Sequence, residues 1–231
     1  METDERTYPR PITTIDLAIF ALAEDGLEVL TIQRAAEPFA GWWALPGGWI
    51  HVDEDLDLDA AARRILASKT GVRTPYLEQL QTFGTSKRDP RGWTVSVAYV
   101  ALLSEDDARD CKRLSQTDVL WRTVAADTVD TRLAFDHAYI LAAALSRVRS
   151  KVEYSTLPVH LLPRAFTLGE LQSVYERILG RKLDKSAFRK RIAEADFVEP
   201  IVGEMRRASN RPAQLFRIRP GQITAFFDRT I

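Results

Sequence analysis

Residues 42–72 have the sequence WWALPGGWIHVDEDLDLDAAARRILASKTGV, and this stretch decides the fold of the chain. An apolar run ends at the pair Gly47–Gly48, which predicts a strand and then a tight turn. Glycine permits positive φ and lets backbone N–H groups approach a ligand. After an acidic loop, apolar residues recur at helical spacing between Leu58 and Leu66, and Gly71 stands where a helix would end in a left-handed residue. The stretch therefore predicts a strand, a turn, a loop and a helix.

This stretch resembles the Nudix box, the pyrophosphatase signature Gly-x5-Glu-x7-Arg-Glu-apolar-x-Glu-Glu-x-Gly-apolar. The residues that match it are Gly48, Glu54, Arg64, Leu66, Gly71 and Val72. Nine residues separate Glu54 from Arg64, where the signature has seven. The positions of the three helix glutamates are occupied by Ile65, Ser68 and Lys69.

The missing glutamates bear on activity. Carboxylates spaced at i, i+3 and i+4 lie on one helix face, where they present oxygen ligands to Mg²⁺. Ile65 and Ser68 offer no carboxylate, and Lys69 would repel a cation. We therefore expect a Nudix fold with no catalytic residue, no metal, no cofactor and no pyrophosphatase activity.

The length of 231 residues predicts two unequal domains. Residues 1–11 are expected to form a flexible arm. Residues 12–150 are expected to form a Nudix-like domain of the α/β class, an α/β/α sandwich. A proline-containing linker is predicted at 151–165, before a second domain at 166–231.

Hydrophobic alternation and turn residues place the elements of the first domain. A hairpin is predicted from strands at 14–22 and 27–34, because Asp25-Gly26 supplies its turn. Further strands are expected at 94–102 and 119–122, an acidic surface loop at 104–118, and a helix from about residue 133 to 149.

The second domain has the pattern of a winged helix-turn-helix. Thr167 and Glu170 form a capping-box pair before a helical run at 168–179, and Asp184 precedes a second helix at 185–195. Two strands, at 197–202 and 214–219, enclose an arginine-rich loop and predict the wing. The list of expected DNA contacts is Lys185, Ser186, Arg189, Lys190, Arg206, Arg207, Asn210 and Arg211.

The charge distribution supports a DNA-binding second domain. The net charge of the chain is zero, yet residues 1–150 carry 17 Lys and Arg against 23 Asp and Glu, while residues 151–231 carry 15 against 9. A basic domain beside an acidic one predicts an anionic partner, here double-stranded DNA. The alternative is that these charges only keep the surface solvated.

Residues of the first domain are expected to bind an effector. Arginine forks suit phosphates, an aromatic ring can stack on a base, and a Gly-Gly turn allows close backbone approach. The alternative roles are surface charge for the arginines, core packing for the tryptophans, an acidic loop for Glu54 and helix capping for Asp136 and His137. The expected effector-binding residues are Arg34, Trp43, Gly47, Gly48, Glu54, Arg88, Arg91, Asp136 and His137.

The remaining features of the sequence indicate the cellular compartment in which the protein works. Cys111 is the single cysteine, which excludes an intramolecular disulfide and fits a reducing compartment. The first residues lack an apolar signal segment, and no run of about 18 apolar residues occurs. We expect a soluble cytoplasmic protein without membrane contact.

Taken whole, the chain resembles the Nudix-related transcriptional regulators of NAD metabolism. The stretches 133–137 (LAFDH), 183–190 (LDKSAFRK) and 210–217 (NRPAQLFR) carry that resemblance. It implies a homodimeric repressor of NAD biosynthesis or salvage genes that binds an inverted-repeat operator and leaves it when ADP-ribose binds. Two alternatives stay open: an active ADP-ribose pyrophosphatase with an accessory domain, and a sugar-responsive regulator of the same architecture.

Overall fold

The computed structural model describes residues 10–24, 26–72, 76–114, 118–125, 128–207, 212–227 and 230–231. Strand β1 (Ile12–Ala23) lies at the centre of the first domain, where it pairs in parallel with β6 (Thr94–Leu102) and antiparallel with β2 (Gly26–Gln33). The sheet order is β3-β2-β1-β6-β5, with β4 on β1 and β7 on β2. The other strands are β3 (Trp43–Ala44), β4 (Gly47–Trp49), β5 (Leu77–Thr85) and β7 (Val119–Thr123).

Helices cover both faces of this sheet and make an α/β/α sandwich. On one face, α1 (Leu58–Thr70) and α2 (Glu105–Leu114) close a core that includes Ile65 and Cys111. On the other face, α3 (His137–Tyr154) packs on apolar side chains from β1 and β6. The predicted fold class of the first domain is confirmed, since the alternating side chains of β1 and β6 supply one core on each face.

Residues 104–118, predicted as a surface loop, instead contain α2. Ser104 accepts a hydrogen bond from the backbone N–H of Asp107 at 3.1 Å and so caps the helix. Ala108 and Cys111 are buried one turn apart, while the acidic residues face solvent. The acidic composition of this stretch concealed a short amphipathic helix, whose buried side includes Ala108 and Cys111.

The predicted linker at 151–165 is ordered and largely buried. Helix α3 continues to Tyr154, and a 3-10 helix, η1 (Leu157–Leu161), follows. Pro158 stands in the first turn of η1, where a missing N–H costs nothing. The predicted linker is therefore a helical connection, and Pro158 lies in the first turn of its 3-10 helix.

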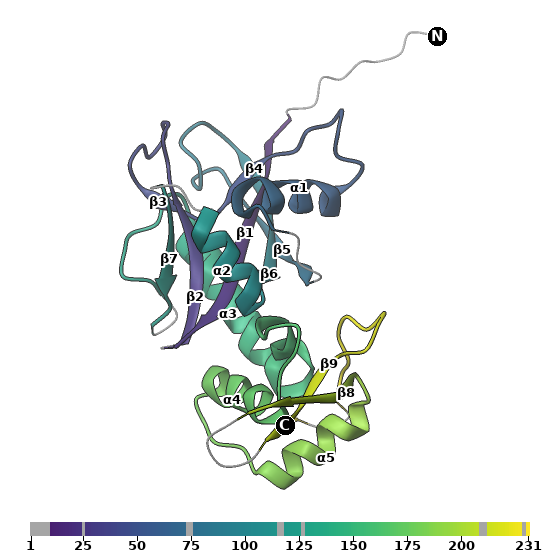
Figure 1. Ribbon diagram of the computed structural model, residues 1–231. Helices are drawn as coiled ribbons and strands as arrows, with labels where there is room; N and C mark the ends of the chain where they lie inside the picture. The colour runs from purple at the N-terminus through teal and green to yellow at the C-terminus, as the bar shows by residue number, and fades with distance from the viewer. Residues whose placement is uncertain are drawn as a thin grey trace.

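The second domain is a winged helix. Helix α4 (Leu168–Leu179) begins with a complete capping box and ends at Gly180, whose φ is 66°. Helix α5 (Lys185–Ala195) is capped by Asp184, and the hairpin of β8 (Val198–Arg206) and β9 (Ala213–Ile218) follows. Figure 1 shows this domain beneath the first, with α3 leading into it.

One continuous apolar core joins the two domains. It runs from Phe20 on β1 through the α3 side chains to Val174 and Tyr175 on α4. Across the same junction, Tyr175 donates its hydroxyl hydrogen to the Ser155 carbonyl oxygen at 2.7 Å, and Arg177 donates to the Glu24 carbonyl oxygen at 2.7 Å. The segment after the wing returns to this region, where the Phe227 N–H donates to the Tyr154 carbonyl oxygen.

Within the described ranges, none of the helices has the length and apolar character that a membrane crossing needs.

The junction yields a stability prediction. Tyr175→Phe should lower the free energy of unfolding by about 1–2 kcal/mol, because the buried carbonyl oxygen of Ser155 loses its donor while the ring stays packed. Urea denaturation measures the change. Tyr139→Phe, on an exposed position of α3, is the matched control and should leave stability unchanged. Equal stability of the two variants would contradict the assigned role of Tyr175.

Candidate functional site

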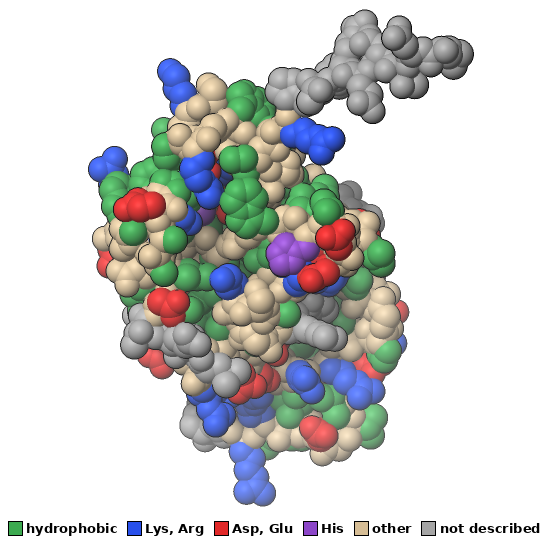
Figure 2. Space-filling view, turned by 90° about the horizontal axis from the view of Figure 1, so that it is seen from above, with side chains coloured by type: hydrophobic (Ala, Val, Ile, Leu, Met, Phe, Trp, Pro, Cys, Tyr) green, Lys and Arg blue, Asp and Glu red, His purple; other side chains and the backbone are tan. Residues whose placement is uncertain are grey.

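The first domain holds a cavity of about 580 Å³ at one end of its sheet. Its walls come from β1, the end of β2, β4, one face of α1, the loop after β5 and the start of α3. Seen from above, basic and hydrophobic side chains surround a hollow on this face of the molecule (Figure 2). The cavity therefore gathers segments from across the whole domain.

A buried ionic cluster forms the floor of the cavity. The Arg88 guanidinium donates to Asp136 through Nε at 2.9 Å and Nη2 at 2.8 Å, and its Nη2 lies 3.3 Å from Asp16 Oδ2. Ser96 donates to the same Asp16 oxygen at 2.6 Å. Burial lowers the pKa of Arg88, but the hydrogen bonds and charge of Asp136 outweigh burial and raise it. Arg88, expected to bind phosphate, lines the cavity and also joins β1 to the start of α3.

His137 is held neutral beside this cluster. Its Nδ1 accepts a hydrogen bond from the backbone N–H of Leu45 at 2.9 Å, so the ring proton resides on Nε2. That Nε2 lies 3.6 Å from Asp16 Oδ1. Burial lowers the pKa of His137. The histidine thus links β1 to the segment between β3 and β4, and it lines the cavity as predicted.

The glycine pair serves close packing rather than a turn. Gly47 and Gly48 lie in β4, pair with Asp16 and Ile15 of β1, and are absent from the glycines with positive φ. A Cβ on Gly47 would lie 2.2 Å from Asp16 Oδ1, which no side chain tolerates without movement. The expected turn geometry is wrong here, although both glycines do line the cavity.

Two arginines stand at the aromatic side of the cavity. Arg34 donates to the carbonyl oxygens of Pro38 and Ala36, and its guanidinium carbon lies 4.6 Å from the centroid of the Phe135 ring. Arg91 pairs with Asp89 at 2.7 Å and lies 5.2 Å from the Trp49 ring centroid. A guanidinium held against an aromatic face keeps its positive charge, which an anion in the cavity can meet.

Three predicted effector-binding residues, Trp43, Glu54 and Asp136, do not line the cavity. Trp43 packs against the core and is covered by the Arg122 guanidinium, 4.6 Å from its ring centroid. Glu54 lies on the exposed loop before α1, where its Oε2 atom is 3.0 Å from His51 Nδ1. Asp136 is engaged by Arg88, as described above.

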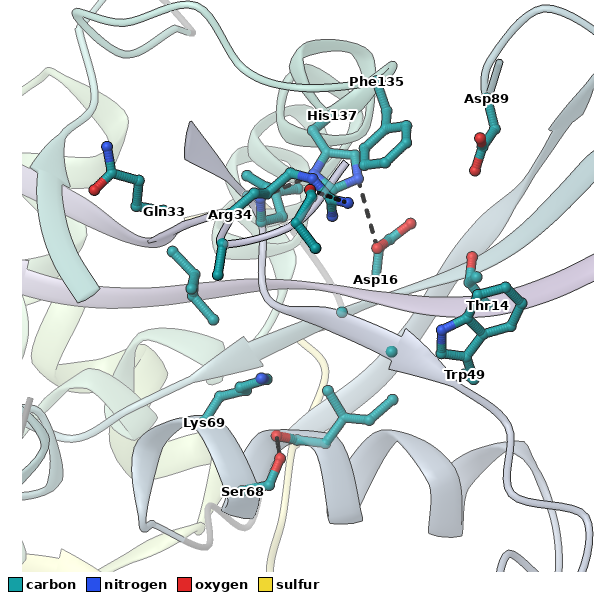
Figure 3. A pocket seen from close by; sticks show the side chains of 18 of the residues that line it. Thr14, Asp16, Gln33, Arg34, Trp49, Ser68, Lys69, Asp89, Phe135 and His137 are labelled. Carbon is teal, nitrogen blue, oxygen red and sulfur yellow. Dashed lines mark hydrogen bonds and ion pairs between the residues drawn. The ribbon is translucent and has the colours of Figure 1, made fainter. Parts of the chain in front are cut away.

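Sequence reasoning missed several residues that line the cavity. Arg64 appeared only as a match to the Nudix box, yet it fixes the loop before α1 by donating to both oxygens of Asp55, whose pKa it lowers to about 2. Phe135 directly precedes Asp136 and His137 in the sequence, and this adjacency could have indicated that its ring lines the cavity. Lining residues outside the predicted set include Arg64. Others that Figure 3 labels are Thr14, Asp16, Gln33, Trp49, Ser68, Lys69, Asp89 and Phe135.

The face of α1 that meets the cavity is unsuited to a divalent cation. It presents Arg64, Ile65, Ser68 and Lys69. Divalent magnesium takes oxygen ligands, mainly carboxylates, and this face offers two cations, an alkyl group and one hydroxyl. Within the part of the chain that the structure describes, no cluster of three His, Cys, Asp or Glu side chains suits a metal ion.

The winged helix presents a basic face of its own. Lys185, Ser186, Arg189 and Lys190 are exposed on α5, while Phe188 on the same helix is buried. On the wing, Arg207 is exposed, and Asn210 and Arg211 lie outside the described residues. Arg206 is also exposed, and its guanidinium is held by Glu170 and by the Ala165 carbonyl oxygen at 3.0 Å.

The comparisons with known proteins agree with both halves of this architecture. Residues 158–218 match the family model of the NrtR DNA-binding winged helix domain, and residues 14–144 match that of the NUDIX domain. The ADPR responsive transcriptional repressor NtrR of Acinetobacter baylyi is 43% identical over 210 residues, which cover 91% of this chain and 83% of that protein.

Solved structures agree as well. The crystal structure of Shewanella oneidensis NrtR complexed with a 27mer DNA aligns with a TM-score of 0.85 at 38% identity, covering 95% of this chain and 99% of that one. The NUDIX domain of the same protein, complexed with ADP ribose, aligns with a TM-score of 0.53 at 37% identity, covering 63% of this chain and 93% of that one.

Gly47 supplies a direct test of the packing at the cavity floor. Gly47→Ala should destabilise the protein by about 1–3 kcal/mol, because the new methyl group displaces the Asp16 carboxylate from Arg88 and Ser96. Gly48→Ala is the matched control, since its Cβ meets only the end of the Ile65 side chain at 3.3 Å. Thermal unfolding compares the two. A Gly48→Ala variant as unstable as Gly47→Ala would contradict this account.

His137 predicts a pH dependence of stability. Because burial lowers its pKa in the folded protein, the unfolded chain takes up a proton that the folded chain excludes. Stability should be full above about pH 6.5, the ordinary histidine pKa, and should fall as the pH drops below it. His160, also buried with a lowered pKa, adds to the fall.

Urea denaturation at about pH 7.5 and about pH 5.5 measures this fall. His137→Gln should make it smaller, because glutamine can accept from Leu45 and does not titrate. Carboxylates with lowered pKa, such as Asp55, lose their contribution only at more acid pH. An unchanged slope in the variant would show that His137 is not the titrating group.

Proposed function

The chain belongs to the NrtR family, and from that premise we propose that it is a transcriptional repressor that leaves its operator DNA when ADP-ribose binds the cavity of its Nudix domain. The observation that carries the proposal is that the cavity and the basic helix α5 belong to two domains joined by one apolar core. A polar, cation-lined cavity and a winged helix with an exposed basic α5 share one apolar core.

The DNA-binding half of the proposal rests on α5 and the wing. A helix with exposed Lys185, Arg189 and Lys190 suits the major groove, where arginine and lysine reach guanine edges or phosphates. Relatives support the same role, since the Shewanella oneidensis protein was crystallised with a 27mer DNA. A homodimer on an inverted-repeat operator near NAD biosynthesis or salvage genes remains part of the proposal.

The effector half rests on the chemistry of the cavity. The diphosphate of ADP-ribose is an anion that arginines can bind, and Phe135 and Trp49 offer faces for a base or a sugar. The Acinetobacter baylyi relative is named ADPR responsive, and the Nudix domain of the Shewanella oneidensis relative was crystallised with ADP ribose. We further propose that the cavity binds without hydrolysis, because α1 presents no carboxylate to it.

Helix α3 offers a route between the two sites. Its first residue, His137, lines the cavity, and Asp136 just before it accepts from Arg88 in the cavity floor. Its last residue, Tyr154, accepts from Phe227 beside the winged helix. A shift of α3 on ligand binding would therefore move the second domain. A coupling free energy of about 1–3 kcal/mol would change DNA affinity about 5- to 150-fold.

The test is DNA binding by the purified protein, with labelled DNA from upstream of its own gene and of neighbouring NAD-pathway genes. ADP-ribose should dissolve a specific complex, whereas ribose or AMP should not. A complex indifferent to ADP-ribose would contradict the effector, and competition by pentoses would then favour the sugar-responsive alternative. Release of AMP from ADP-ribose in the presence of Mg²⁺ would favour the pyrophosphatase alternative.

Variants separate the two domains in the same assay. Arg189→Met should weaken operator binding by about 1–3 kcal/mol, because it removes an exposed cation from the proposed groove-facing side of α5. Arg109→Met, an exposed position on α2 in the first domain, is the control and should bind like the wild type. Equal binding by Arg189→Met would exclude that side of α5 from the DNA interface.

A further inference from the structure

The cations that line the cavity fall into two classes. Three of them are neutralised by carboxylates: Arg64 by Asp55, Arg88 by Asp16 and Asp136, and Arg91 by Asp89. The other two, Arg34 and Lys69, have no carboxylate within ion-pair distance among the residues that the structure describes. Arg34 donates only to carbonyl oxygens, and the Lys69 side chain is exposed to the cavity.

These two cations come from opposite walls. Arg34 follows β2 and is held against Phe135, whereas Lys69 lies in the last turn of α1. Figure 3 shows Lys69 and Ser68 on the helix at one side of the cavity, with Arg34, Phe135 and His137 at the other side. An anion in the cavity is therefore approached by positive charge from both sides.

The α1 wall is also where the Nudix box would hold its metal. The chain resembles that signature, yet the three glutamate positions carry Ile65, Ser68 and Lys69. Ile65 is buried, and its side chain packs against Gly48 of β4. The hydroxyl of Ser68 donates to the Ile65 carbonyl oxygen at 2.9 Å. Of the three positions, only Lys69 brings a charge to the cavity, and that charge has the sign of the missing metal.

We propose that the Lys69 ammonium takes the place of the divalent cation, so that Lys69 and Arg34 together hold the diphosphate of the effector without metal. The inference rests on the proposed function and specifies how its effector site works. A diphosphate carries one negative charge on each phosphate, which two unpaired cations on opposite walls match. An ammonium neutralises charge but generates no metal-bound hydroxide, so the same substitution explains binding without hydrolysis.

Isothermal titration calorimetry of the full chain with ADP-ribose tests the proposal. The wild type should bind equally well in excess EDTA and in Mg²⁺. Lys69→Met should weaken binding about tenfold, which corresponds to about 1.4 kcal/mol, because one of two cations is lost. Adenosine, which lacks the diphosphate, should bind both proteins alike if it binds at all.

Arg63→Met is the matched control. Arg63 is an exposed cation of the same helix, but its side chain does not line the cavity. Its affinity for ADP-ribose should stay within about twofold of the wild type, a difference well below 1 kcal/mol. Thermal unfolding should be unchanged in both variants, since both side chains are exposed.

The outcomes separate this inference from the proposed function. Binding that requires Mg²⁺, or equal affinity of Lys69→Met and the wild type, would overturn the role of Lys69 and leave ADP-ribose as the effector. No binding of ADP-ribose by the wild type, with or without Mg²⁺, would overturn the effector itself and this inference with it.

Discussion

The ionic cluster of Asp16, Arg88 and Asp136 is the constraint on which the rest of the site depends. Taking charges out of water is costly, and a buried pair repays the cost only when hydrogen bonds satisfy it. Here Arg88 bonds both carboxylates, and Ser96 satisfies Asp16 further. The cluster fixes the first turn of α3 against β1, and Gly47 must lack a side chain because Asp16 occupies the space.

The arginines that line the cavity differ in how far neighbouring carboxylates neutralise their charge. Arg88 is buried and paired with two carboxylates, so it defines the geometry of the floor and its charge is largely neutralised. Arg91 is partly neutralised by Asp89. Arg34 is oriented by carbonyl oxygens and an aromatic face, which hold a guanidinium without cancelling its charge. The net charge offered to a ligand is therefore far smaller than a count of basic side chains indicates, and its position is sharply defined.

The sequence predicted the elements whose ends carry local signals. Thr167 with Glu170 and Asp184 mark helix starts through their own hydrogen bonds, and α4 and α5 are confirmed at the expected bounds. Contacts between distant segments were not predictable. Arg88 meets a carboxylate 48 residues away. Trp43, expected at the ligand, packs against the core, whereas Trp49 lines the cavity, and no local pattern distinguishes the two tryptophans. Lys69 was identified as incompatible with a metal, but only the fold places it on the cavity wall.

On the proposed function, the continuous core constrains how the two sites communicate. Because α3 is fixed by Asp136 at one end and packs on α4 through the shared core at the other, the domains are not independent bodies on a tether. Coupling of binding free energies is reciprocal, so if ADP-ribose weakens DNA binding by a given factor, operator DNA must weaken ADP-ribose binding by the same factor. The effector must then bind a DNA-incompetent state more tightly, since a ligand shifts an equilibrium only through its differential affinity for the two states. On this proposal, the two states differ in the packing of α3 against α4. Lys69 lies on α1, across the sheet from α3, and so it can raise affinity for the effector without contributing to that difference. His137, the first residue of α3, lines the cavity and is placed to set the difference.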